Sequence, residues 1–115
     1  MKTVMLVCII KRSRVLIDQI MTGFMEIGVT GATLIEGRGM GQIVKQDVPI
    51  FSGLAELFPG GETDSSMIFS VVDEEVLEAA VAVVEQAEGS VLGTPGKGII
   101  FALPVTYFKG VKHGF

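Results

Sequence analysis

The segment 3–10 has the sequence TVMLVCII and is apolar at nearly every position. A strand with one face in water alternates apolar and polar residues, so this pattern predicts a strand that is covered on both faces. The run is too short to cross a bilayer and lacks the small-residue cleavage site of a signal peptide. The lone cysteine, Cys8, excludes an intramolecular disulfide, suits a reducing cytoplasm, and is expected to serve as a small core residue.

The residues after this strand predict a helix and two further strands. Ser13 is a suitable N-cap for a helix with apolar residues at helical spacing, and Gly28 is its expected end. Residues 30–36 (TGATLIE) and 66–72 (SMIFSVV) are predicted strands. A long connection, residues 37–64, separates these two strands.

The last third of the chain predicts one more helix and one more strand. Asp73 is the expected N-cap of the helix, and Gly89 is its expected end. The buried stripe of this helix is predicted to consist of Leu77, Ala80, Val81 and Val84. Residues 98–105 (GIIFALPV) form the final predicted strand, with Pro104 marking its exit or a sheet edge.

This order of elements predicts an α+β fold over residues 1–115: a single ferredoxin-like βαββαβ sandwich, with two helices on one face of an antiparallel sheet. Two helices cover only one face of four strands, although the first strand is apolar on both. Hydrophobic residues make up 49% of the chain, which is more apolar surface than a fold of two layers can bury. We therefore expect sister subunits to cover the second face.

The connection 37–64 is longer than most loops without secondary structure. Its residues 49–58 (PIFSGLAELF) are apolar enough to form a short helical turn, and PGGETD at 59–64 predicts a turn. Two interpretations stay open: a mobile arm that contacts a partner or ligand, or a surface excursion without function.

Glycines gather at two strand ends. Gly37, Gly39 and Gly41 follow the second strand, and Gly93, Gly96 and Gly98 precede the last. Glycines at such ends let backbone N–H groups approach an anion, with Lys97 and Arg38 as the charges nearby. The clusters match neither the Walker pattern nor G-x-G-x-x-G. The alternative is that they are only turns.

Other kinds of function find little support. A net charge of −4 and a pI near 4.9 argue against nucleic acid as a partner. His113 is the single histidine, without the companions that a metal site needs, so no metal ligands are predicted. No nucleophile–base pair can be named, so the chain is predicted not to be an enzyme.

Two segments resemble the PII family of nitrogen regulatory proteins. Residues 28–42 (GVTGATLIEGRGMGQ) are similar to the family's second strand and the start of its T-loop. Residues 94–105 (TPGKGIIFALPV) are similar to its nucleotide-gripping B-loop and last core strand. In this register the resemblance covers nearly the whole chain.

The resemblance implies a cytoplasmic homotrimer that binds an adenine nucleotide as an effector in the clefts between subunits. It also implies a T-loop, here 37–64, that docks onto a target protein such as an enzyme, a transcription factor or a membrane transporter, without membrane insertion. Nitrogen or carbon metabolism is the setting it suggests. The nucleotide-binding residues predicted on this basis are Thr33, Gly39, Gly41, Gln42, Gly96, Lys97, Gly98 and Lys112.

The sequence also departs from the family pattern. Gln42 stands where a phosphate-binding arginine is usual, and Ile43 where the family has a glutamine that helps to hold magnesium and 2-oxoglutarate. In the B-loop, Lys97 replaces an acidic residue and Ile99 replaces a lysine. Lys109 and Lys112 stand near the family's C-terminal arginines, and 37–64 contains no tyrosine for modification.

Three hypotheses follow from these observations. The first is a ligand-sensing PII-like trimer that binds an adenine nucleotide or another small anion. The second is a trimeric assembly protein that has lost its ligand; the missing arginine and lysine favour it, whereas the glycines argue against it. The third is a metal-handling protein like the CutA group, which shares the architecture but for which this chain has no Cys/His cluster.

Overall fold

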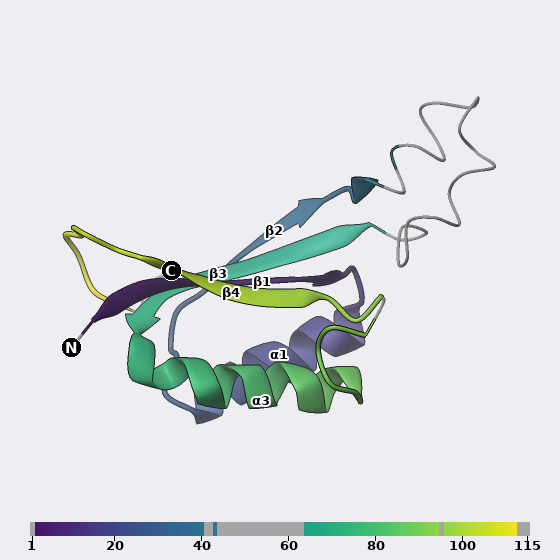
Figure 1. Cartoon of the computed structure of the whole chain (residues 1–115), viewed down its shortest axis with the longest axis horizontal. Coiled ribbons are helices and arrows are strands. Elements are labelled where there is room, and N and C mark those ends of the chain that lie inside the picture. The colour runs from purple at the N-terminus through teal and green to yellow at the C-terminus, as the bar shows by residue number, and fades with distance from the viewer. Residues whose placement is uncertain (1, 41–42, 44–63, 95, 113–115) are drawn as a thin grey trace.

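The computed structural model describes residues 2–40, 43, 64–94 and 96–112 (Figure 1). Its helices and strands are β1 (Thr3–Lys11), α1 (Arg14–Glu26), β2 (Thr33–Gly37), β3 (Ser65–Asp73), α3 (Leu77–Glu88) and β4 (Ile99–Pro104). A 3-10 turn, η2 (Glu74–Val76), leads into α3. The helical turn predicted at 49–58 lies outside the described residues, as does most of the connection 37–64.

The four strands form one antiparallel sheet in the order β2-β3-β1-β4. The central strand β1 pairs with β3 on one side and with β4 on the other. Both helices lie on the same face of the sheet (Figure 1). The predicted α+β, ferredoxin-like βαββαβ arrangement is confirmed.

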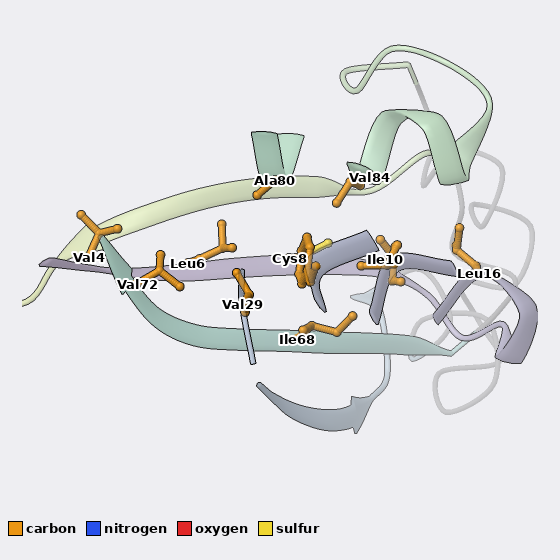
Figure 2. Packing of buried hydrophobic residues seen from close by; sticks show 12 residues of the cluster. Val4, Leu6, Cys8, Ile10, Leu16, Val29, Ile68, Val72, Ala80 and Val84 are labelled. Atoms are coloured by element: carbon orange, nitrogen blue, oxygen red, sulfur yellow. The ribbon is translucent and has the colours of Figure 1, made fainter. Parts of the chain in front are cut away.

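The core lies between the sheet and the two helices. Alternate residues of β1 point into it, and side chains from β3 and α3 meet them (Figure 2). Cys8 is fully buried in this cluster, and burial raises the pKa of its thiol to about 12. The thiol is therefore neutral at physiological pH, and Cys8 is confirmed as a core residue.

The ends of the helices follow the sequence signals with one exception. The Ser13 hydroxyl accepts a hydrogen bond from the Leu16 N–H at 3.3 Å, and Gly28 leaves α1 with φ of +97°. Gly89 ends α3 in the left-handed conformation. Asp73 occupies the predicted N-cap position, but of the 3-10 turn η2 that leads into α3. Its carboxylate makes no capping hydrogen bond within the described chain and instead accepts one from Lys112 Nζ, at 2.5 Å.

Two strand boundaries and one helix face differ from the predictions. Strand β2 begins at Thr33. Before it, the Gly31 carbonyl accepts a hydrogen bond from the Ser70 hydroxyl, at 2.5 Å, in place of a bond from a strand backbone. Strand β4 begins after Gly98, whose φ of +89° is not a strand conformation. The stripe of α3 that faces the core contains Ala80 and Val84, as predicted, but its next buried residue is Glu88, and Val81 is not part of the core cluster.

The two helices pack closely against each other at Gly23. A Cβ at this position would lie 2.5 Å from Cγ1 of Val83, whose β-branched side chain has little rotamer freedom. We expect Gly23→Ala to lower the free energy of unfolding by about 1–3 kcal/mol through overpacking. The measurement is urea denaturation at fixed protein concentration. In a Val83→Ala background the same change should be neutral or stabilising, because the clash is gone and alanine favours helix; equal losses in both backgrounds would contradict the account.

Candidate functional site

The two glycine clusters lie at the same end of the sheet. Gly37 is the last residue of β2 and pairs with Ser65, which in turn pairs with Lys11 at the end of β1. Gly98 immediately precedes β4, whose first residue, Ile99, pairs with Ile9. The right-hand end of the sheet in Figure 1 therefore carries both clusters, together with the end of β1.

The same register also separates the clusters, since β2 and β4 are the two edges of the sheet. Three strand spacings of about 4.8 Å place Gly37 and Gly98 about 14 Å apart. Within one chain, the two glycine segments therefore do not form a single cradle. Lys11 and Ser65 lie between them.

Gly98 is held against the end of β1. A Cβ at Gly98 would lie 2.6 Å from the Ile9 carbonyl oxygen, so the close approach and the positive φ both require glycine. Gly96 also has positive φ, +81°, and the Lys97 N–H donates to the Thr94 carbonyl at 3.1 Å. These contacts fix the backbone on both sides of Lys97, whose side chain is half-buried.

Gly39 has more room than Gly98. A Cβ there would meet only the Ser65 hydroxyl, at 3.5 Å, which is ordinary contact. The other predicted residues of this segment, Gly41 and Gln42, lie outside the described residues.

A charged cluster that the sequence did not predict joins the two stems of the connection 37–64. Arg12 donates through Nε to Glu36 Oε2 at 2.7 Å and through Nη1 to Asp64 Oδ2 at 3.0 Å. The Ser66 hydroxyl donates to the same Glu36 oxygen at 2.8 Å, and the Arg12 N–H donates to the Asp64 carbonyl at 2.7 Å. Arg12 therefore ties the exit of β1 to the end of β2 and to the residue that precedes β3.

Glu36 stays ionised in this cluster. The hydrogen bond from Ser66, followed by the contact with Arg12, lowers the pKa of the Glu36 carboxyl below its usual value, and partial desolvation opposes this. Because the pKa of this carboxyl is lower in the folded state, its ionisation stabilises the fold at any pH above the pKa of the unfolded chain. That contribution is lost as the pH falls through the folded-state pKa. At low pH we therefore expect protonation of Glu36 to weaken its contacts with Arg12 and Ser66, where the connection 37–64 leaves the sheet.

Thr33 and Lys112 lie away from the glycine clusters. Thr33 pairs with Phe69 in the middle of the sheet, four residues or about 13 Å from the end of β2. Lys112 binds Asp73, which pairs with Thr3 at the opposite end of β1. Eight residue steps along β1 separate the two ends by about 27 Å, so Lys112 and Lys97 of one chain do not share a site.

The face of the sheet opposite the helices is apolar across all four strands. The register aligns Thr33, Phe69, Val7 and Phe101 in one row and Ile35, Met67, Ile9 and Ile99 in the next. No described element covers this face, which we call the open face. Ile35, Ile99, Phe101 and Leu103 are each between 40% and 54% exposed on it. Exposed apolar surfaces of this kind are typical of interaction sites.

Within the described residues, no helix is long and apolar enough to cross a membrane, and no three metal-ligating side chains gather into a group.

Comparisons with known proteins agree on the relationship. The family described as "Nitrogen regulatory protein P-II" matches residues 1–114. Among solved structures, PII of Arabidopsis thaliana bound to citrate superposes with a TM-score of 0.60 at 20% identity, over 90% of this chain and 75% of that one. A search of curated proteins finds no match. Because the family match spans almost the full sequence and the fold agrees with it, this chain belongs to the P-II family of nitrogen regulatory proteins.

Proposed function

We propose that this chain is a ligand-sensing P-II regulator that works in the cytoplasm as a homotrimer. It binds a small anion, such as an adenine nucleotide or a polycarboxylate, in the clefts between subunits. The connection 37–64 carries the bound state to a partner protein. The P-II family consists of regulatory signal-transduction proteins whose members form trimers and bind partners, which supports this assignment.

The observation that carries the proposal is the convergence of glycine and positive charge at one end of the sheet. Gly98 is locked against β1, Gly37 and Gly39 leave β2, and the basic residues Lys11 and Lys97 belong to the same end. Exposed backbone N–H groups and ammonium groups are the donors that anions prefer.

A site between subunits accounts for the spacing of these groups. The glycine clusters of one chain are about 14 Å apart, at opposite sheet edges, so each needs a partner surface to enclose a ligand. Lys112, at the far end of its own chain, reaches Lys97 only from a second copy. Association through the open face brings such copies together and buries the apolar rows described above.

The related plant protein suggests where to begin with ligands. That PII was crystallised with citrate, a small polycarboxylate. Citrate and the adenine nucleotides share several negatively charged oxygens, which backbone N–H groups and lysines can hold. Because Ile99 takes the place of the family's B-loop lysine, we expect the site to favour ligands with few phosphates.

The test of this function is the loss of one charge. We expect Lys97→Ala to weaken binding of citrate or of ADP about 10- to 150-fold, since a charge-assisted contact contributes roughly 1.5–3 kcal/mol. The measurement is calorimetric titration of the parent and the variant at the same ionic strength. Lys97→Arg should retain most of the affinity, because it keeps the charge.

Arg14→Ala is the matched control, since Arg14 is an exposed cation at the start of α1, beyond the same end of β1. It should bind within about twofold of the parent. Equal losses in Lys97→Ala and Arg14→Ala would mean that only net charge matters, and no loss in Lys97→Ala would place the ligand elsewhere.

A second candidate function is a trimeric assembly protein without a ligand. The specific observation in its favour is Ile99, which extends the open face where the family's lysine would contribute charge. The two candidates differ in the same titration: an assembly protein binds none of the anions yet remains trimeric.

A further inference from the structure

The last residue of α3 is a buried carboxylic acid, one oxygen of which has no hydrogen-bond partner among the described residues. Glu88 is only 9% exposed. Within the described part of the chain, the buried side-chain oxygens that lack a hydrogen-bond partner are Glu88 Oε1 and Ser90 Oγ. An ionised carboxylate that is buried and unpaired is costly, so the neutral acid is favoured in this position.

The surroundings of Glu88 include groups of both signs. Lys97 and Lys11 are close enough for their charges to act on it, and it acts in turn on the Cys8 thiol of β1, which stays neutral. On its own helix, Glu85 lies one turn earlier. Burial raises the pKa of Glu88, and the two lysines partly oppose this. The C-terminal end of a helix also disfavours a negative charge.

Glu88 is connected directly to the segment that carries Lys97. Gly89 ends the helix, and the segment that contains residues 90–94 and 96–98 precedes β4. This return is held at two points: the Leu92 N–H donates to Glu85 Oε2 at 2.9 Å, and Gly98 packs against Ile9. The backbone beside Lys97 is therefore held in place, and the charge of Lys97 acts on the Glu88 carboxyl group.

We propose that Glu88 is a proton-operated gate on the anion site: the neutral acid leaves Lys97 to the anion, and the ionised acid draws Lys97 into an ion pair and repels the anion. This inference rests on the proposed function, because it assigns a regulator to the Lys97 site. It makes the regulator sensitive to pH as well as to its ligand.

The sign of the effect follows from linkage. Because the folded-state pKa of Glu88 is raised, Glu88 loses its proton only above the usual glutamate range, as the pH rises through that folded-state value. Anion affinity should fall over the same range. Citrate and ADP also titrate, so the informative quantity is the affinity of Glu88→Gln divided by that of the parent at each pH.

We expect this ratio to be near one in acid and to rise to about 3- to 10-fold once Glu88 is ionised, the size of one partly screened charge interaction. The experiment is calorimetric titration of both proteins with citrate, and separately with ADP, across the pH range. Glu85→Gln is the matched control: it removes a charge one turn away and keeps an acceptor for the Leu92 N–H. Its ratio to the parent should stay flat.

A second readout needs neither a variant nor a ligand. In NMR spectra of the unliganded parent, the side-chain carboxyl carbon of Glu88 and the amides of Lys97 and Gly98 should titrate together. The gate is contradicted if the affinity ratio of Glu88→Gln to the parent does not change with pH. It is also contradicted if the chemical shifts of the Lys97 and Gly98 amides do not change as Glu88 titrates. If neither citrate nor ADP binds the parent but the amide shifts change as Glu88 titrates, the proposed ligand is wrong. The coupling between Glu88 and the Lys97 segment is then still supported.

Discussion

Ile99→Glu is expected to convert the trimer into monomers. Ile99 lies on the edge strand β4, at the end of an apolar row on the open face, and is 54% exposed in the single chain. In a monomer the new carboxylate would remain in contact with water, so the fold should survive. In the trimer it would be buried in every copy without a partner, which costs several kcal/mol for each charge.

The measurement is sedimentation equilibrium at micromolar concentration. The parent should give a mass near three chains of 12.2 kDa each, and Ile99→Glu a mass near one. Val15→Glu is the matched control, because Val15 is 68% exposed on α1, away from the open face. A monomeric parent, or an Ile99→Glu variant that stays trimeric, would contradict the interface. Val7 is less suitable for this test, since it is only 3% exposed even in one chain and a charge there threatens the fold itself.

Gly98→Ala should be the most damaging of the glycine substitutions at the site. Its Cβ would lie 2.6 Å from the Ile9 carbonyl and 3.0 Å from a methyl carbon of Ile10, and its φ of +89° disfavours any side chain. The backbone strain alone costs about 1–3 kcal/mol, and the clash with a central strand adds to it. We expect a loss of stability in urea denaturation together with weaker anion binding.

Gly93→Ala separates the two causes. Gly93 belongs to the same segment and has φ of +101°, but no atom of the described residues lies within 4 Å of its would-be Cβ. It should show the strain without the clash, and therefore a clearly smaller loss of stability. If the two variants are equally destabilised, the close approach of Gly98 to β1 contributes nothing.

The fold could be predicted from local patterns because each pattern has a local cause. The unbroken apolar run at β1 indicated a strand with two apolar faces, and Ser13, Gly28 and Gly89 marked helix ends through backbone geometry. Asp73 misled for the same reason: it is a good N-cap in isolation, but its carboxylate is engaged by Lys112, which is 39 residues away.

The site was harder to predict because its contacts depend on strand register. Arg12 meets Glu36 and Asp64 only after β1, β2 and β3 are aligned. Glu88 did leave a signal, since it continues the spacing of four residues from Ala80 and Val84, although glutamate at the end of a helix usually faces water. The family resemblance implied that Lys112 and Lys97 serve one nucleotide site, whereas the two lysines of one chain belong to opposite ends of β1.

Calorimetric titration of the parent protein with AMP, ADP, ATP, cyclic AMP, 2-oxoglutarate and citrate tests the central claim most directly. The account predicts saturable binding of at least one of these anions to the assembled trimer, with up to one site for each chain and weaker binding at higher salt. A folded, trimeric parent that binds none of them would contradict it. The glycines would then be turns alone, and the chain an assembly protein.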